Sequence, residues 1–492
     1  PTLRGTDEEE LVKQLAQLAL DEAVRAGAAY ADARAVIARS ESLAVQDERV
    51  EGVERDTSRG VGVRVLVAGS WGFAATARLE PAYILSAARR AVEVARASTT
   101  AQRGPVRLAP AEVARGSWTT PHELDPFAVG LDEKLSLLLA ATAAAKQVPG
   151  LTFAKASTDA WKTTTWFVSS EGSDLEQEIV QVAGGVSCVA VGEQELQTRS
   201  FPNSFRGYCG SGGWEDIRAL DLAGQAPRYA EEAVALLSAP ELPSDVGTLV
   251  LDGNQVALQV HESVGHALEL DRVLGFEAAY AGTSFVALDD LGILRYGSPV
   301  VDLVLDTTTP RGLGTFGYDD EGVPATRTPL VVGGVLHGVL SSRETAVRLG
   351  PEQRSNGTMR ADSWAAIPLI RMSNIHLEPG EGSLEQLLED TGRGVFMTTN
   401  RSWSIDDRRV NFQFGCEAAY EIDGGRLRRL YRNPTYTGRT TEFWGSCDAV
   451  AGPQEWRVYG TPNCGKGQPP QTARVAHGAS PARFRAVQMG IR

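Results

Sequence analysis

Residues 260–267 read Val260-His261-Glu262-Ser263-Val264-Gly265-His266-Ala267, and the C-terminal half of the sequence is organised around them. The chain has only six histidines, and two of them lie here with a glutamate between them. Neutral imidazole is the commonest metal ligand, and a neighbouring carboxylate can accept a proton from water that a metal activates. The stretch therefore predicts a metal centre on a helix.

The two histidines are separated by five positions, whereas zinc peptidases with the H-E-x-x-H motif separate them by four. On a regular α-helix, which turns by about 100° per residue, His261 and His266 would point about 140° apart. A π-bulge would bring them to one side, and Gly265 could supply the local backbone freedom. Two alternatives stay open. The pair Glu262 and His266, at i and i+4, could supply the ligands, or both histidines could be structural.

Length and composition limit the class of protein. A chain of 492 residues is too long for one ordinary core, so two domains are expected. Hydrophobic residues make up 42% and charged residues 22%, which indicates a globular protein and excludes a disordered one. The net charge of −14 argues against a nucleic-acid partner, because phosphates would repel the protein.

The sequence also predicts a compartment. No apolar run is long enough to span a bilayer, and the acidic N-terminus lacks the apolar region of a signal peptide. Five cysteines, an odd number without a C-x-x-C pair, are expected to be reduced thiols. We therefore expect a cytoplasmic protein without membrane contact.

The chain divides into two parts of different character. Residues 1–238 mix helical patterns with strand-like runs and predict an α+β domain with helices on a sheet. Residues 239–245 contain prolines and polar side chains and are predicted to form a linker. Residues 246–492 consist of short strand-like runs around the histidine-bearing helix. They predict a mainly antiparallel β domain that carries the candidate metal centre.

Several local elements are predicted within the first part. Alternation over 61–67, followed by Gly69-Ser70, indicates a β-hairpin. Pro81 is typical of a first helical turn, and the helix that it opens is expected to end near Ala97. Other patterns predict a helix over 132–147 and two separate short strands over 152–156 and 163–169.

A catalytic zinc usually has three protein ligands, so two ligands on one helix require a third from elsewhere. Cys464 is the attractive candidate because thiolate binds zinc well, and its neighbours predict a glycine-rich loop. Lys466 would favour the thiolate form. The alternative is that Cys464 is simply a small loop residue.

The same segment contains a misleading pattern. Residues 460–466 have the form G-x-x-x-x-G-K, with which a phosphate-binding loop begins. Gly467 stands where a Ser or Thr would hold magnesium, and no helix pattern follows, so we reject nucleotide binding. His122, His376 and His477 have no partner that the sequence identifies.

Taken together, the motifs resemble the TldD/PmbA metalloprotease family. Residues 261–266 resemble the H-E-x-x-x-H motif of its TldD branch, and residues 464–468 resemble its C-terminal cysteine loop. Other segments agree in the same order along the chain: 64–73, 312–322, 371–374 and 432–436. The tail after Gln468 does not match throughout. Because the PmbA branch lacks the histidine motif, the chain resembles the catalytic subunit.

The resemblance implies a zinc-dependent peptidase with His261, His266 and Cys464 as ligands of Zn²⁺ and Glu262 as general base. It favours the pair His261 and His266 over the pair Glu262 and His266. It also implies a heterodimer with a PmbA/TldE-like partner subunit, a homodimer being the alternative. The metal would face a chamber that admits unfolded peptides and excludes folded proteins.

Members of the family trim leader peptides from modified-peptide precursors or degrade small unstable proteins, and these are the functions that the resemblance implies. An extended substrate is expected to bind by adding a strand to a sheet edge. Two other functions remain as alternatives. One is amide hydrolysis or tailoring of a peptide-like natural product, and the other is a non-catalytic peptide-binding scaffold with structural histidines.

Overall fold

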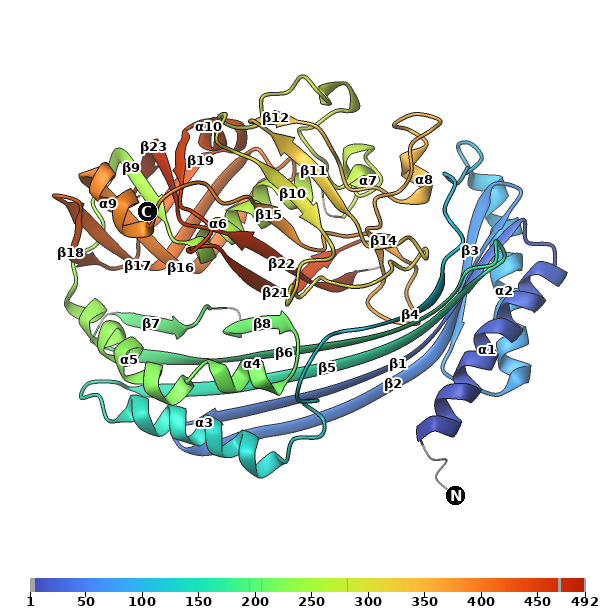
Figure 1. Ribbon diagram of the computed structural model, residues 1–492, viewed down its shortest axis with the longest axis horizontal. Coiled ribbons are helices and arrows are strands. Elements are labelled where there is room, and N and C mark those ends of the chain that lie inside the picture. Colours follow the sequence, from blue (N-terminus) through green and yellow to red (C-terminus); the bar gives the residue numbers. More distant parts are fainter. Residues whose placement is uncertain (1–4, 194, 205, 281, 468–469, 491–492) are drawn as a thin grey trace.

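The computed structural model describes residues 5–193, 195–204, 206–280, 282–467 and 470–490. It mixes helices and strands, which confirms the predicted α+β class. Figure 1 shows a long, curved sheet formed by the N-terminal half and, on its inner side, a body of shorter strands around the helix α6 (Gly253–Val260). Among the described helices, none is both long and apolar enough to cross a membrane.

The curved sheet, called the large sheet below, has eight strands within the described ranges. Their order is β3-β2-β1-β5-β6-β4, and β7 and β8 also pair with β6. The pairings are antiparallel, except that β4 runs parallel to β6. The strands are β1 (Tyr30–Gln46), β2 (Arg49–Val67), β3 (Ser70–Thr76), β4 (Arg115–Thr119), β5 (Phe153–Ser169), β6 (Asp174–Val191), β7 (Leu196–Phe201) and β8 (Tyr208–Ser211).

The predicted hairpin is present as β2 and β3, which pair from Val61–Thr76 to Val67–Ser70. The prediction of two short strands over 152–156 and 163–169 is wrong, because both belong to the single strand β5. The polar residues 157–159 resemble a loop in the sequence. In the structure they pair with β1 on one side and β6 on the other, so their backbone groups are satisfied within the sheet.

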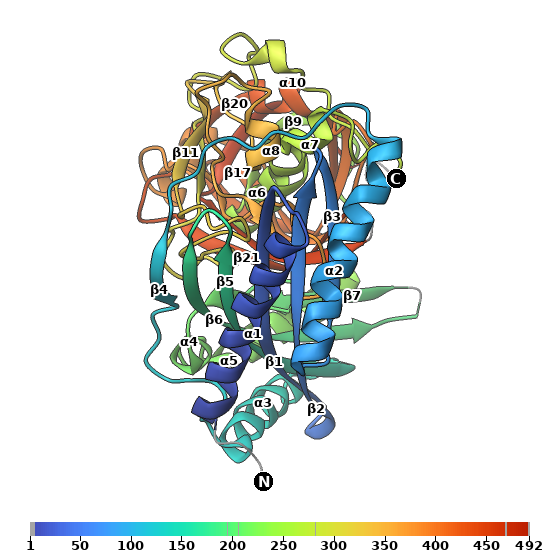
Figure 2. The same cartoon turned by 90° about the vertical axis from the view of Figure 1, so that its right-hand side faces the viewer.

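Helices cover the outer face of the large sheet. Helices α1 (Gly5–Arg25) and α2 (Pro81–Ser98) run along β1 and β2, as Figure 2 shows. Helices α3 (Leu131–Lys146) and α5 (Leu222–Ser238) cover the other end of the same face, and α4 (Trp214–Ala219) precedes α5. The helices predicted at 81–97 and 132–147 are thereby confirmed. Their buried faces are rich in alanine, which permits close packing on the strands.

The C-terminal half contains a second sheet in the order β16-β9-β23-β19-β17-β18, with β20 beside β23. Because β16 also pairs with β17, this sheet closes on itself around an aromatic core that includes Phe412, Tyr436 and Phe484. Its strands are β9 (Asp245–Leu251), β16 (Arg393–Ile405), β17 (Asn411–Asp423), β18 (Arg426–Tyr431), β19 (Thr435–Arg439), β20 (Cys447–Val450) and β23 (Ala482–Met489).

Smaller elements complete this half and surround α6. The hairpin of β21 (Arg457–Lys466) and β22 (Gln471–Ala479) lies between α6 and the large sheet in Figure 1. The remaining strands are β10 (Leu303–Asp306), β11 (Arg327–Val332), β12 (Val335–Leu336), β13 (Met359–Arg360), β14 (Leu369–Ile370) and β15 (Ile375–Leu377). The remaining helices are α7 (Leu270–Val273), α8 (Arg343–Ala346), α9 (Leu384–Thr391) and α10 (Thr440–Gly445).

Candidate metal centre

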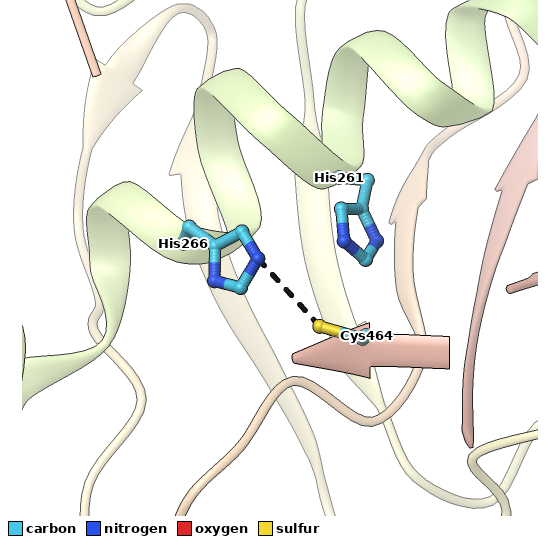
Figure 3. Close-up of side chains that lie close together, drawn as sticks. All are labelled: His261, His266 and Cys464. Atoms are coloured by element: carbon cyan, nitrogen blue, oxygen red, sulfur yellow. Dashed lines mark hydrogen bonds between the residues drawn. The ribbon is translucent and has the colours of Figure 1, made fainter. Parts of the chain in front are cut away.

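The histidine stretch does not form a regular α-helix. Helix α6 ends at Val260, a π-helical turn follows over His261–Gly265, and a short 3₁₀ turn spans His266–Leu268. The wider turn brings the two imidazoles to the same side of the helix, with ring centroids 5.0 Å apart (Figure 3). The π-bulge that the spacing predicted is therefore present.

The predicted role of Gly265 in this turn is wrong. Its backbone angles, φ −54° and ψ −59°, are ordinary helical values that any residue adopts. A Cβ atom at this position would lie 1.9 Å from Sδ of Met372. Glycine is required here because the helix packs closely on Met372, and the backbone needs no special freedom.

Cys464 lies on strand β21, which corrects the prediction of a glycine-rich loop. The strand brings the buried Sγ atom to 3.6 Å from Nε2 of His266 (Figure 3). One candidate ligand atom from each of His261, His266 and Cys464 lies within 4.8 Å of the other two. Glu262 is outside this group, so the geometry favours the His261–His266 pair over the Glu262–His266 pair.

This group of donors fits a zinc ion. With Zn–N near 2.0–2.1 Å and Zn–S near 2.3 Å, ligand atoms around a tetrahedral zinc lie about 3.3–3.8 Å apart. The 3.6 Å between Nε2 of His266 and Sγ of Cys464 lies in this range. Imidazole and thiolate both bind zinc, and catalytic zinc has three protein ligands, which leaves a fourth position open.

Each histidine has a partner that orients its ring. Nδ1 of His266 lies 3.1 Å from Oε2 of the fully buried Glu269. Nδ1 of His261 lies 2.8 Å from Nε2 of His477, whose own Nδ1 lies 3.0 Å from the carbonyl oxygen of Ile375. A carbonyl only accepts, so His477 donates from Nδ1 and accepts from His261 at Nε2. Nε2 of both His261 and His266 is thus left with its lone pair, as a metal requires.

Burial and neighbouring charges favour the protonation states that bind metal. Burial lowers the pKa of His261 and of His266, so both rings are neutral at neutral pH. Burial alone would raise the pKa of the Cys464 thiol, but His266, in the state in which it carries a second proton, and the Arg371 guanidinium outweigh it and lower this pKa. Arg371 also donates a hydrogen bond to the carbonyl oxygen of Cys464.

The prediction that Lys466 favours the Cys464 thiolate is not what the structure shows. Nζ of Lys466 lies 2.7 Å from Oδ1 of Asp271 and 3.3 Å from Oε2 of Glu269. Burial would raise the pKa of Glu269, but Lys466 and His266 lower it well below its ordinary value. Lys466 therefore keeps the carboxylate behind His266 ionised.

Glu262 lies next to the ligand group and is held by an arginine. Its Oε2 atom accepts a hydrogen bond of 2.7 Å from Nη1 of Arg409, in the turn between β16 and β17. Both residues line a cleft of about 370 Å³ together with the three candidate ligands. Trp403 also lines this cleft and is 43% exposed, whereas Trp444 is buried in the core.

The sequence alone does not reveal the supporting residues. It gives His477 no partner, marks Arg371 only as part of the segment 371–374, and gives Glu269 and Arg409 no signal of their own. Glu269 lies three positions after His266, and the others reach the site from distant parts of the chain. Gln468, part of the motif that resembles the cysteine loop, lies outside the described residues.

Comparison with known proteins adds three family matches. PmbA/TldA metallopeptidase domain 1 matches residues 31–98, the central domain matches 124–239, and the C-terminal domain matches 244–489. Together they span most of the chain, including every candidate site residue.

Individual proteins agree with the family models. A metalloprotease of Methanothermobacter thermautotrophicus is 30% identical over 94% of this chain and 95% of its own length. A zinc metalloprotease TldD homolog of Saccharolobus solfataricus is 25% identical over 55% of this chain and 54% of its own. The crystal structure of TldE from Thermococcus kodakarensis has the same fold, with a TM-score of 0.73, 14% identity, and coverage of 97% of this chain and 100% of that one.

Proposed function

Because the chain belongs to the PmbA/TldD metallopeptidase family, we propose that it is a zinc-dependent peptidase of the TldD type. Its substrates are unfolded peptides or small unstable proteins, and removal of leader peptides from modified-peptide precursors is one reaction of this class. The observation that carries the proposal is the convergence of His261, His266 and Cys464 beside Glu262 in one cleft.

The residues have distinct roles in this proposal. His261, His266 and Cys464 hold the ion, which supplies Lewis-acid polarisation of the peptide carbonyl and makes water nucleophilic at neutral pH. Glu262 accepts the proton of the attacking water and returns it to the leaving amine. Arg409 fixes the Glu262 carboxylate through Oε2, and Oε1 has no hydrogen-bond partner among the described residues.

The substrate binds in an extended form. The cleft is bordered by residues 403–405 of β16 and by Thr461 and 463–465 of β21. In the described part of the chain β21 pairs only with β22, and Arg371 takes the carbonyl oxygen of Cys464, so the peptide backbone would pair with other groups of this strand edge. Main-chain hydrogen bonds to such an edge give affinity that depends little on sequence, and a folded protein cannot present an extended strand to it.

We also propose that the chain pairs with a PmbA/TldE-like subunit, a homodimer being the alternative. The fold shared with TldE of Thermococcus kodakarensis supports this, because subunits of like shape can associate around a pseudo-twofold axis. Co-purification of this chain with a PmbA-type chain, followed by measurement of the mass of the complex, tests the pairing.

Metal content tests the ligand set. We expect about one zinc per chain in protein purified without chelators, and a loss of most of it in Cys464→Ala, because two ligands bind zinc much more weakly than three. Elemental mass spectrometry gives the stoichiometry. Cys447→Ala, which removes another buried thiol, is the matched control and should keep its zinc. Full zinc in Cys464→Ala, or none in the folded wild type, would contradict the proposal.

Substitution of the base tests the reaction. Glu262→Gln should lower kcat by about 10²–10⁴-fold, the usual contribution of general acid–base catalysis, while the zinc content stays unchanged. The cleavage rate of an unfolded peptide and the zinc content are measured on the same preparation. Glu442→Gln, on the exposed surface, should cleave at the wild-type rate. Normal cleavage by Glu262→Gln would exclude Glu262 as the base.

A further inference from the structure

A second cleft of about 400 Å³ lies between the large sheet and the hairpin of β21 and β22. Its floor is formed by residues of β5 and β6, including Thr163, Thr165 and Gln181. Arg474 of β22 and Arg360 of β13 line the opposite side. None of these residues has a role in the proposed reaction.

The two arginines are held in place by neutral groups. Nε of Arg474 donates to Oε1 of Gln181 at 2.6 Å, and its guanidinium lies 5.0 Å from the ring centre of Trp161. Nη1 of Arg360 donates to the carbonyl oxygens of Met372 and of Arg474, at 3.2 and 2.8 Å. Among the described residues, no carboxylate forms a salt bridge with either guanidinium. The other N–H groups of these two guanidiniums have no protein acceptor among the described residues.

The acidic residues of this cleft are engaged elsewhere. Asp320 pairs with Arg34 at 3.3 Å and accepts from the backbone N–H of Ala361. Asp362 accepts from the hydroxyl of Ser363 and the backbone N–H of Thr472.

Asp319 also lines the cleft. Its carboxylate oxygens accept three backbone N–H groups, so they are already engaged. Burial together with nearby Glu321 raises its pKa well above the usual value.

Burial lowers the pKa of both arginines. The pKa of Arg360 falls to about 10, with the neighbouring Arg371 and Arg474 contributing and Asp320 opposing the shift. The pKa of Arg474 also falls to about 10, with Asp362 opposing the shift. Both remain cations at neutral pH. Two partly desolvated cations that form no salt bridge among the described residues destabilise the fold, which favours a functional reason for their presence.

We propose that Arg360 and Arg474 bind a carboxylate group of the peptide, supplied by an acidic side chain or by the C-terminus. This inference rests on the proposed function, because it names a chemical class of its substrates. The planar guanidinium fork matches a carboxylate, and hydroxyl and amide groups of β5 and β6 complete a polar surface around it.

The place of the cleft connects it to the metal centre. Ala473, the neighbour of Arg474, is the cross-strand partner of the candidate ligand Cys464. A carboxylate on Arg474 therefore lies on the hairpin that supplies Cys464, but on the face turned toward the large sheet, because neighbours on a strand point to opposite faces. Its binding would anchor the peptide beside the metal centre and would add a preference for acidic peptides to otherwise sequence-tolerant main-chain recognition.

Peptide binding to full-length Glu262→Gln, which should not cleave, tests the inference. Three rhodamine-labelled forms of one unstructured peptide are compared by fluorescence anisotropy: one interior Glu with an amidated C-terminus, Gln with an amidated C-terminus, and Gln with a free C-terminus. We expect at least one carboxylate form to bind about tenfold more tightly than the neutral form, as a charge-assisted hydrogen bond allows. Which form gains affinity identifies the source of the carboxylate.

The discrimination should fall to less than about twofold when Arg474→Gln is added, and should be partly retained by Arg474→Lys, which keeps the charge without the fork. Arg439→Gln removes an exposed arginine and should keep the full discrimination. The thermal midpoint of Arg474→Gln should be unchanged or raised, because an unpaired charge is removed. A merely structural Arg474 would instead lower the midpoint and leave the discrimination intact.

Equal affinity for all three peptides, absence of binding, or full discrimination in Arg474→Gln would overturn the inference. If Arg474→Gln does not fold, two other measurements decide. Arg474→Lys should discriminate less than the arginine form, and the affinity for the carboxylate peptide should fall as salt rises, because binding through two cations is screened. The proposed function is judged separately. A wild type that prefers the Glu peptide without cleaving any peptide would keep this inference and contradict the peptidase. A wild type that cleaves peptides but binds the Glu and Gln peptides equally would support the peptidase and overturn this inference.

Discussion

His477 orients His261, one of the three candidate metal ligands. A histidine can bind a metal through either ring nitrogen, and the hydrogen bond of the other nitrogen selects which one is used. His477 accepts a hydrogen bond from the Nδ1–H group of His261 and donates one from its own Nδ1–H group to the carbonyl oxygen of Ile375. His261 is therefore oriented by a neutral chain, whereas His266 is oriented by the ionised Glu269.

Replacement of His477 should weaken metal binding without removing a ligand. We expect His477→Ala to raise the zinc Kd by about 10–100-fold, the usual effect of losing an orienting partner, and His477→Gln to recover part of the loss through its amide oxygen. Competition with a chromophoric chelator measures the Kd. His337→Ala, at an exposed position, is the control. An unchanged Kd in His477→Ala would mean that His261 needs no partner.

At the scale of residues, the sequence indicates groups that share a local motif and misses those that the fold adds. His261, Glu262 and His266 are visible because they lie within six positions, and Cys464 because thiolate is a chemically suitable third donor. The role of Arg371 could not be predicted, since its charge reaches the site only through a contact with a distant segment. Glu269 lies three positions after His266, but nothing in the spacing distinguishes it from an ordinary acidic residue. Lys466 was linked to Cys464 by proximity in sequence, whereas the fold directs its ammonium to Asp271 and Glu269.

At the scale of elements, the π-turn over His261–Gly265 is the feature that makes a five-residue spacing useful. A regular helix would place the second imidazole on another side, far from Cys464. The turn packs against β15 and the segment before it, and the close approach of Met372 to Gly265 fixes that contact. Packing on the helix therefore determines the site as much as the ligands do.

Substitution of Gly265 tests this packing. Gly265→Ala should lower the free energy of unfolding by about 1–3 kcal/mol, because the new methyl group overlaps Met372. Urea unfolding of the metal-free protein measures the change. In a Met372→Ala background the space is free, and the same substitution should cost less or stabilise through the higher helix propensity of alanine. An equal loss in both backgrounds would show that Gly265 is needed for its backbone.

Elements with a strong helical period were predicted well, as α2 and α3 show. The failures have a common cause in β5 and β21. Polar or glycine-rich residues within these strands resemble loops, because their sequence does not reveal that neighbouring strands satisfy their backbone groups.

At the scale of the whole molecule, buried ion pairs join the large sheet to the C-terminal half. Arg64 of β2 contacts Asp32 at 2.7 Å and Glu321 at 3.1 Å, and Arg34 of β1 contacts Asp320. The run 318–321, which contributed to the family resemblance, thus meets the inner face of the sheet. This contact bounds the second cleft, so it fixes the proposed carboxylate site as well as the fold. The division of the chain at residues 239–245 stays a prediction.

Loss of the central arginine tests how firmly the halves are joined. Arg64→Met leaves Asp32 and Glu321 buried without their cation and should lower the free energy of unfolding by about 3–5 kcal/mol. Urea unfolding followed by tryptophan fluorescence measures it, and Arg90→Met, at an exposed ion pair, should change it by less than about 1 kcal/mol. Adding Asp32→Asn and Glu321→Gln to Arg64→Met should recover much of the loss, since no buried charge is then left unpaired. If the triple variant is no more stable than Arg64→Met, the loss comes from packing of the arginine side chain on Trp71 within the large sheet, and not from its charge.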